Sequence, residues 1–279
     1  MLTNFKDILQ DAYRGKYSVG SFNVYNYETM RGVADVAIET SAPLLIAFGE
    51  RYLENMSLKT VHAIAQALLE DSPVSVCLHL DHCTSMSTVY QAIKAGFGSV
   101  MYDGSMLPFE ENMANTKLVC DVAHACGVSV EAELGSLASG EHSHEGKKSD
   151  KENYTDPDAA KEFVETTNVD ALAVSIGTVH GLYKGEPNIR VDILKELNAA
   201  LGIPLVLHGG SGTPEETIRE CIRNGICKIN INTEISMHVM ENTARLLGDK
   251  KPHYSVLSLK QADLVAEVVK KYVSIFAAK

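Results

Sequence analysis

The chain has 279 residues, of which 45% are hydrophobic and 22% are charged, the composition of an ordinary globular protein. Because 36 acidic residues stand against 25 basic ones, the formal charge is −11, which argues against a nucleic-acid or anionic-membrane surface. No apolar run reaches the roughly 20 residues of a membrane span, and Met1–Asp7 lacks a signal-peptide pattern. The six cysteines stand singly without CxxC spacing, so we expect reduced core thiols in a cytoplasmic protein.

Eight short apolar or β-branched runs alternate with stretches of helical periodicity. No linker or low-complexity tract interrupts them, so we interpret residues 1–279 as one domain. Eight strand-then-helix units are typical of a (β/α)₈ TIM barrel with an α/β architecture, whereas an open doubly wound sheet would favour a GxGxxG motif after the first strand, which is missing. The predicted strands are Tyr17–Asn23, Leu44–Phe48, Val74–Leu80, Ser99–Tyr102, Ser129–Leu134, Ala171–Ile176, Pro204–Leu207 and Lys228–Ile231.

Polar residues stand at or just beyond the end of almost every predicted strand. A barrel gathers these strand ends into one ring, which is where barrel enzymes place their chemistry. The pattern therefore favours a barrel with an active site at this ring. The residues concerned are Asn23, Asp81, His82, Asp103, Glu133, His180, His208, Asn230 and Asn232.

Two helix starts carry local signals. One is Asp156-Pro157-Asp158, and the other, Thr213-Pro214-Glu215-Glu216, combines an N-cap threonine with a first-position proline and a capping-box glutamate. We expect an additional C-terminal helix over Ser258–Phe276, which covers the barrel or packs on another subunit. The long polar segment Gly135–Thr155 predicts a mobile active-site loop, with a solvated insertion as the alternative.

Three histidines differ from the others in placement, because each ends a predicted strand: His82, His180 and His208. Three neutral imidazoles with an open fourth position form a catalytic zinc site. His79 competes with His82, but three positions away on an extended strand it should point to the opposite side, so we interpret it as a core or supporting residue. His142 lies on the long loop, which is a poor place to fix metal geometry.

Carboxylates accompany these histidines. Asp81 follows an apolar strand, where an unpaired carboxylate would be costly, so it is the best general acid/base candidate; the alternative is that it orients a ligand imidazole. Asp103 and Glu133 end neighbouring strands and could bind a cation or hold the histidines. Glu131 shares a face with Glu133, so the two would repel each other unless a cation or base lies between them.

A glycine-rich turn follows the seventh predicted strand. In His208-Gly209-Gly210-Ser211-Gly212, glycines let backbone N–H groups approach an anion, and the following helix start adds a favourable field. Barrels frequently bind phosphate in the loops after strands seven and eight. Gly181 and Lys184 could supply a further amide and a cation.

A Schiff-base lysine is the main rival mechanism for sugar-phosphate chemistry on a barrel. It would require a lysine at the carboxyl end of a strand. Lys228 begins its predicted strand, which places it on the opposite, stability face, and Lys184 lies in a loop without obvious desolvation. The sequence therefore favours metal chemistry.

Seven motifs occur in order along nearly the whole chain. They are Gly20-Ser21-Phe22-Asn23, Leu78-His79-Leu80-Asp81-His82, Phe109-Glu110-Glu111-Asn112, Val130-Glu131-Ala132-Glu133-Leu134-Gly135, Gly177-Thr178-Val179-His180-Gly181, His208-Gly209-Gly210-Ser211-Gly212 and Lys228-Ile229-Asn230-Ile231-Asn232-Thr233-Glu234. Together they resemble the motifs of the class II, zinc-dependent ketose-bisphosphate aldolases that act on fructose and tagatose bisphosphates.

The resemblance implies that His82, His180 and His208 hold the catalytic Zn²⁺. Asp103 and Glu133 match positions for a second metal ion or an alternate zinc position, so a second divalent or a monovalent cation is possible there.

The resemblance also assigns proton-transfer and substrate positions. Asp81 would exchange the proton on the C4 oxygen as the C3–C4 bond breaks or forms, and Glu141 matches a loop glutamate that moves the proton on dihydroxyacetone phosphate. The positions that match substrate contacts are Gly181, Lys184, Gly209, Gly210, Ser211, Asn230 and Thr233, with Asn23 and Asn232 nearby.

The chain departs from the family pattern at two places. Ala138–Ser143 replaces the usual Gly-Gly-x-Glu-Asp-Asp loop and keeps only its glutamate, Glu141. Lys260 stands where many fructose-bisphosphate enzymes carry an arginine that reaches the distal phosphate. Asn232-Thr233-Glu234 is similar to fructose-type sequences, whereas Ile176-Gly177-Thr178 is similar to tagatose-type ones.

The sequence therefore predicts a class II metal-dependent aldolase, a carbon–carbon lyase that cleaves a ketose 1,6-bisphosphate to dihydroxyacetone phosphate and glyceraldehyde 3-phosphate. Fructose 1,6-bisphosphate is placed ahead of tagatose 1,6-bisphosphate, and another 1-phosphorylated ketose is a further alternative. A non-catalytic sugar-phosphate-binding barrel is the hypothesis from a different class. We expect small phosphorylated sugars as ligands, no nucleic-acid or membrane partner, and a homodimer or homotetramer.

Overall fold

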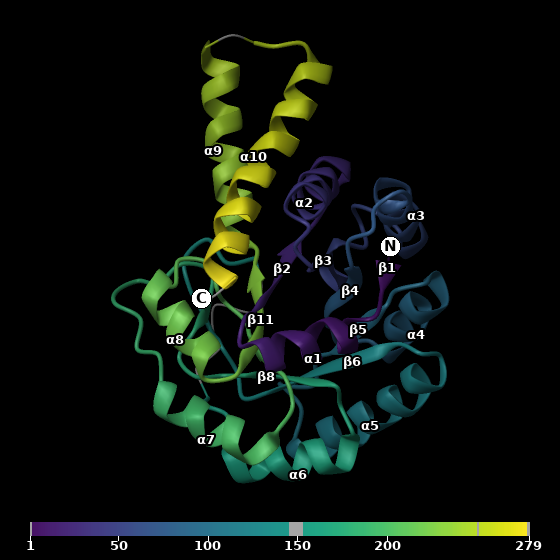
Figure 1. Ribbon diagram of the computed structural model, residues 1–279, viewed down its shortest axis with the longest axis vertical. Coiled ribbons are helices and arrows are strands. Elements are labelled where there is room, and N and C mark those ends of the chain that lie inside the picture. Colours follow the sequence, from purple (N-terminus) through teal and green to yellow (C-terminus); the bar gives the residue numbers. More distant parts are fainter. Residues whose placement is uncertain (1, 145–152, 250, 278–279) are drawn as a thin grey trace.

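Eight parallel strands close into a barrel in the computed structural model, which describes residues 2–144, 153–249 and 251–277 (Figure 1). The barrel closes where the last strand pairs with the first, Lys228–Ile231 lying beside Val19–Phe22. The TIM-barrel prediction is confirmed. In spatial order the strands are β2 (Val19–Asn23), β3 (Leu44–Gly49), β4 (Val76–Cys83), β5 (Ser99–Tyr102), β6 (Ser129–Leu134), β8 (Ala171–Val174), β10 (Leu205–Leu207) and β11 (Ile226–Ile231).

Each predicted strand overlaps one of these eight, because strands buried on both faces form the continuous apolar runs by which they were predicted. Helices cover the outside of the barrel, and among the described residues none is both long and apolar enough to cross a membrane. They are α1 (Phe5–Gly15), α2 (Tyr27–Thr40), α3 (Leu58–Leu69), α4 (Met86–Ala95), α5 (Phe109–Ala125), α6 (Pro157–Thr167), α7 (Val191–Leu201), α8 (Glu215–Arg223), α9 (Thr233–Asp249) and α10 (Tyr254–Phe276), with a 3₁₀ turn η1 (Glu50–Tyr52) after β3.

Three two-residue strands were not predicted. β1 (Leu2–Thr3) pairs with β4, and β7 (Ala138–Ser139) pairs with β9 (Val179–His180) in a separate small sheet. Two residues are too few to show any hydrophobic periodicity.

The long segment predicted as an active-site loop is partly tied to the barrel. Residues 145–152 lie outside the described residues. Of the described part of the segment, Ser136 pairs with Asn153, and Glu141 pairs with Leu182 just after β9. Glu141 is thereby placed beside the strand that carries His180, while mobility of the loop stays a prediction.

Both predicted helix starts are followed by a helix, α6 after Asp156 and α8 from Glu215, but only one of the two predicted caps is correct. The Asp156 side chain accepts a hydrogen bond from the Ala159 N–H and caps α6. The N-cap prediction for Thr213 is wrong, because α8 begins at Glu215 and the Thr213 hydroxyl instead donates to the Gly209 carbonyl. The Thr213 side chain therefore hydrogen-bonds within the glycine-rich turn and does not cap α8.

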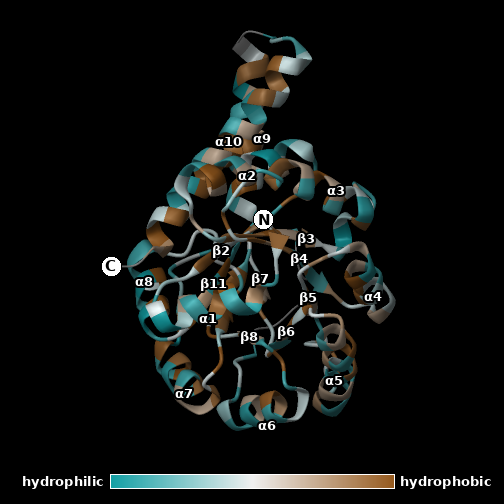
Figure 2. Cartoon of the chain, turned by 45° about the vertical axis from the view of Figure 1, so that its right-hand side comes forward, coloured by the Kyte–Doolittle hydropathy of each residue, from teal (hydrophilic) through white to brown (hydrophobic). Residues whose placement is uncertain are grey.

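The predicted C-terminal helix exists and is longer than expected, because α10 begins at Tyr254. Its lower part packs on α2 and buries the face that includes Val265, Val269 and Tyr272. Its upper part and α9 form a hairpin that projects away from the barrel (Figure 1). The hairpin carries apolar colour at its tip in Figure 2. Its exposed apolar side chains are Met240, Leu247, Tyr254, Val256 and Leu259.

All six cysteines are free thiols, as expected from their spacing. Burial raises the pKa of the Cys120, Cys221 and Cys227 thiols to about 12. The prediction of a core position is wrong for Cys126, which is exposed near the end of α5. Since the thiolate is the reactive form, we expect Ellman's reagent to titrate one thiol rapidly in the native protein and all six in denaturant. Replacing Cys126 with serine should remove the fast phase, and a fast phase that survives this replacement would contradict the packing described.

Candidate active site

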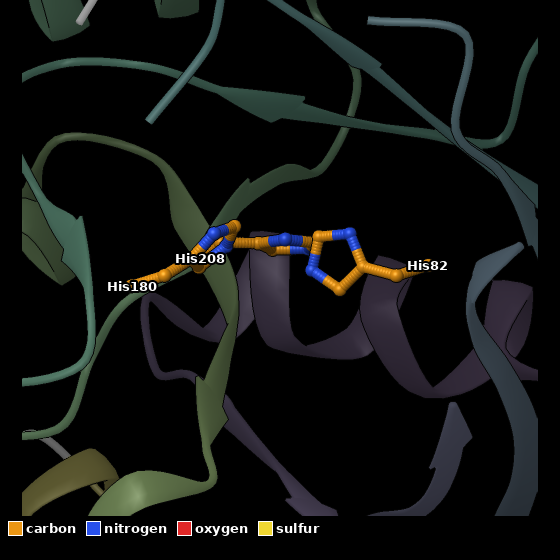
Figure 3. A group of neighbouring side chains, drawn as sticks. All are labelled: His82, His180 and His208. Carbon is orange, nitrogen blue, oxygen red and sulfur yellow. The ribbon is translucent and has the colours of Figure 1, made fainter. Parts of the chain in front are cut away.

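Three histidine rings converge at the carboxyl-terminal end of the barrel. His82 is the last residue but one of β4, His180 ends β9, and His208 follows β10 directly. Their ring centroids lie 4.4 Å apart for His82 and His208, and 5.0 Å apart for His82 and His180. Each offers a ring nitrogen within 4.8 Å of those of the other two (Figure 3). The structure thus brings together the three residues that the sequence selected by placement alone.

His82 reaches this position through an irregularity in β4. Strand alternation would direct His79 and Asp81 to one side and His82 to the other. His82 has a φ of 44°, in the left-handed region, and the pairing of β4 with β5 shifts register between Leu80 and Cys83. His82 and His79 therefore both contact carboxylates of the barrel interior, and the prediction that His79 points to the opposite side from His82 is wrong.

Two of the three histidines have a carboxylate on one ring nitrogen. His82 Nδ1 lies 2.9 Å from Asp103 Oδ2, and His208 Nε2 lies 2.9 Å from Glu131 Oε1. The opposite nitrogens, His82 Nε2 and His208 Nδ1, are buried and make no hydrogen bond with the described groups. A metal-binding histidine typically donates its other N–H to a carboxylate. The donor set therefore fits Zn²⁺, which prefers imidazole nitrogens and keeps an open position in catalytic sites.

A second group of possible ligands shares His82 and adds Asp103 and Glu133. Glu133 Oε2 lies 3.9 Å from His82 Nδ1 and 3.4 Å from His208 Nδ1, and it too is buried without a hydrogen bond to any residue that the structure describes. Burial and the charge of Asp103 raise the pKa of Glu133 well above its usual range. This carboxyl group is one that a nearby cation would stabilise in its ionised form.

Asp81 is fixed by two asparagines. Asn23 Nδ2 donates to Oδ2 at 2.8 Å, and Asn230 Nδ2 donates to Oδ1 at 3.0 Å. Burial by itself raises the pKa of Asp81. The positive charges of His82 and Lys228 lower the pKa by more than burial raises it, so the pKa of Asp81 lies well below its usual range. The carboxylate is therefore ionised at neutral pH and held in one orientation, which suits a base.

Lys228 lies inside the barrel, and its prediction as a residue of the stability face is wrong. β11 begins two residues earlier than expected, at Ile226, so that Lys228 is a mid-strand residue with a fully buried side chain. Its Nζ lies 2.8 Å and 3.0 Å from the two oxygens of Glu131. The repulsion expected between Glu131 and Glu133 predicted a cation or base near them. The ammonium group of Lys228 lies beside Glu131 and is such a cation.

The glycine-rich turn after β10 is packed tightly against the neighbouring strands. Gly209 has a φ of 70°, and a side chain there would lie 2.2 Å from the Val179 carbonyl oxygen. Gly210 N donates to the Asn230 carbonyl, and Ser211 Oγ accepts from Glu234 N in the first turn of α9. The turn therefore lies against the start of α9, a helix of 17 residues.

Gly181 brings the loop glutamate close to the same region. Its φ is 103°, and a side chain there would lie 2.4 Å from the Glu141 carbonyl oxygen. The Glu141 side chain itself is exposed. Lys184 is also exposed, in the segment between β9 and α7.

Asn232 and Thr233 lie where β11 gives way to α9, and both are buried. Asn232 donates to Tyr52 Oη at 3.2 Å and accepts a hydrogen bond from the Tyr25 hydroxyl. The structure does not bring Lys260 to the predicted substrate-binding residues. Its Nζ donates to Asp263 at 3.0 Å on the exposed side of α10.

Sequence reasoning missed Lys228 as an interior residue and missed the two tyrosines. A signal for Lys228 was present, because the argument that a charge in an apolar strand must be paired, applied to Asp81, holds equally for Lys228 in Ile226–Ile231. Tyr25 and Tyr52 carry no comparable signal, because each lies beyond the end of its strand and is distant in sequence, by 207 and 180 residues respectively, from Asn232, which both contact.

Comparisons with known proteins agree with this geometry. The family model described as "Fructose-bisphosphate aldolase class-II" matches residues 3–279. The sulfofructosephosphate aldolase of Alkalicoccus urumqiensis is 36% identical over 276 residues, covering 98% of this chain and 96% of that protein. A fructose-bisphosphate aldolase of Staphylococcus aureus strain Mu50 is 40% identical over 256 residues, covering 91% and 88%. The crystal structure of the YdjI aldolase of Escherichia coli K12 superposes with a TM-score of 0.86 at 33% identity, covering 99% and 97%.

Proposed function

Because the chain belongs to the class II fructose-bisphosphate aldolase family, we propose that it cleaves a ketose 1,6-bisphosphate reversibly, with fructose 1,6-bisphosphate as the favoured substrate. The products are dihydroxyacetone phosphate and glyceraldehyde 3-phosphate. The observation that carries the proposal is the placement of a buried, ionised Asp81 beside three converging histidines, His82, His180 and His208.

We propose Zn²⁺ as the metal, held by these three histidines through His82 Nε2, His208 Nδ1 and a ring nitrogen of His180. When bound, zinc would supply a Lewis acid for the ketone oxygen of the substrate. We assign Asp103 and Glu133 to an alternate position of the zinc or to a second cation.

Asp81 is proposed to accept the proton of the C4 hydroxyl as the C3–C4 bond breaks, and to return it in the condensation direction. Its two asparagine contacts hold the carboxylate in place for this transfer. We propose that Glu141, whose backbone pairs with Leu182 beside His180, exchanges the proton on the carbon of dihydroxyacetone phosphate.

The phosphate of dihydroxyacetone phosphate is proposed to lie between the glycine-rich turn and the start of α9. Ser211 is close to the first turn of α9, whose N-terminal field favours an anion. Thr233 would contribute its backbone and hydroxyl there. The remaining residues proposed to contact the substrate are Asn23, Gly181, Lys184, Gly209, Gly210, Asn230 and Asn232.

Two other substrates have support. Tagatose 1,6-bisphosphate, which differs from fructose 1,6-bisphosphate in configuration at C4, is supported by the tagatose-type motif Ile176-Gly177-Thr178. A ketose phosphate with a sulfonate at its far end is the second, because a relative 36% identical over 98% of the chain is named a sulfofructosephosphate aldolase.

The deciding experiment is triose-phosphate release from fructose 1,6-bisphosphate, tagatose 1,6-bisphosphate and sulfofructose phosphate, measured side by side with and without a chelator. We expect chelator-sensitive cleavage, restored by added Zn²⁺, with the highest kcat/KM for fructose 1,6-bisphosphate. A higher kcat/KM for either other sugar would replace the favoured substrate. Tight binding of dihydroxyacetone phosphate by zinc-loaded protein without cleavage of any of the three would indicate the non-catalytic barrel.

We further propose that the chain forms a homo-oligomer through the α9–α10 hairpin. Tyr254 and Leu259 are 76% and 61% exposed on this projecting element, and clustered exposed apolar side chains favour association. Light scattering should give at least twice the monomer mass, and Leu259→Glu should lower it. Leu118→Glu, on an exposed apolar residue of α5, is the matched control and should leave the mass unchanged. A wild-type protein of monomer mass would contradict this.

The six free thiols are those of a protein from a reducing compartment, and we propose the cytoplasm.

A further inference from the structure

A lysine and a glutamate form an ion pair in the interior of the barrel, beneath the three histidines. Neither the Lys228 nor the Glu131 side chain has exposed surface, and Lys228 Nζ lies within 3.0 Å of both carboxylate oxygens. Burying such a pair costs several kcal/mol per ion in lost hydration, and well-packed apolar residues of similar volume often stabilise a fold as well or better. Stability alone therefore does not account for the pair.

The pair is connected to the candidate metal site through one oxygen atom. Glu131 Oε1 accepts from Lys228 Nζ at 3.0 Å and lies 2.9 Å from His208 Nε2. When His208 Nε2 carries the proton and donates it to Glu131, Nδ1 keeps a lone pair for a cation. The contact with Glu131 thus selects which nitrogen of His208 is available.

Lys228 restrains the orientation of this carboxylate. Because Nζ contacts both oxygens, the carboxylate plane is fixed, with Oε1 directed at His208. The other nearby partner is His79, whose Nε2 lies 3.7 Å from Glu131 Oε2 and 3.7 Å from Asp81 Oδ1. Without the ammonium group, Glu131 could turn toward His79 and release His208.

The corresponding carboxylate on His82 is held differently. Asp103, 17% exposed, accepts hydrogen bonds from the Ser105 backbone N–H and from the Ser105 hydroxyl. Glu131, which is fully buried, has Lys228 in this role. An internal cation is therefore the means by which the structure holds a carboxylate behind His208.

We propose that Lys228 is a positioning residue of the metal site, which fixes Glu131 and thereby the ring orientation and protonated nitrogen of His208, and so increases the affinity for Zn²⁺. This inference rests on the proposed zinc site.

The test compares Zn²⁺ affinity, by chelator competition, among wild type, Lys228→Met and the double variant Lys228→Met/Glu131→Gln. Losing a residue that holds a metal ligand by a hydrogen bond typically weakens metal binding by about 10- to 100-fold. We expect a loss of this size in Lys228→Met, because Glu131 is then no longer held against His208. The double variant removes both charges of the pair and leaves neither without its partner, so its melting temperature should recover relative to Lys228→Met, while its zinc affinity stays at least about 10-fold below wild type.

Ile226→Ala is the matched control. It creates a cavity at a fully buried position of the same strand, far from His208 in register, and should lower the melting temperature while leaving zinc affinity within about twofold of wild type. The absorption bands of Co²⁺-substituted protein provide a second readout: they should change in both Lys228 variants and remain as in wild type in Ile226→Ala.

Zinc affinity of the double variant within about twofold of wild type would overturn the inference, and this variant decides the matter if Lys228→Met does not fold. Failure of the wild-type protein to bind Zn²⁺ would instead overturn the proposed function. The two failures are thus distinguishable.

Discussion

Replacing Asp81 with alanine is expected to lower kcat by about 10²- to 10⁴-fold, the contribution typical of a positioned acid or base, while the protein keeps its zinc. Asp81 accepts hydrogen bonds from Asn23 and Asn230, and it is not one of the proposed zinc ligands, which are the three histidines. Steady-state kinetics with fructose 1,6-bisphosphate and metal analysis of the same sample check both parts of the prediction.

Asp170 provides a matched control at the other end of the barrel. It precedes β8, its side chain is only 3% exposed, and its carboxylate accepts from His124, Lys6 and the Val130 N–H. Asp170→Ala should lower the melting temperature while leaving kcat and zinc content near wild type. A near-normal kcat in Asp81→Ala would show that Asp81 only orients its neighbours.

Replacing His208 with alanine is expected to abolish zinc retention through dialysis and, with it, turnover. The variant loses the buried ring nitrogen Nδ1, proposed above as the zinc ligand, and Glu131 loses its contact with the site. Deleting a ligand should weaken binding by more than the roughly 100-fold upper range for an outer partner. Metal analysis after dialysis and chelator competition measure the effect.

His124 serves as the corresponding histidine control, because it bonds Asp170 at the amino-terminal end of the barrel. His124→Ala should retain zinc and activity. Full activity of a metal-free His208→Ala protein would refute the zinc assignment altogether.

The barrel could be predicted from sequence because its two determinants are local. Continuous apolar runs such as Leu44–Gly49 indicate strands buried on both faces, and polar residues at their carboxyl ends indicate a ring. The same reasoning selected His82, His180 and His208 before any distance was known, because strand ends of a closed barrel must meet.

The remaining features depend on backbone geometry or on contacts distant in sequence. Strand periodicity could not place His82 and His79 correctly, because the left-handed φ of His82 breaks the alternation on which the argument rested. The pairing of Lys228 with Glu131 spans 97 residues and depends on which strands face each other across the barrel. A two-residue error in the start of β11 was enough to assign Lys228 to the wrong end.

The seam between β2 and β11 has a consequence for how the protein acquires its metal. Residues 19–22 pair with residues 228–231, so the barrel cannot close until almost the entire chain is available. Contacts this distant in sequence form late, because the entropy of closing the intervening loop must be overcome first. Lys228 lies on the closing strand and holds Glu131 behind His208. Under the proposed role of Lys228, a nascent or partly folded chain would bind zinc weakly, and tight metal uptake would report completion of folding.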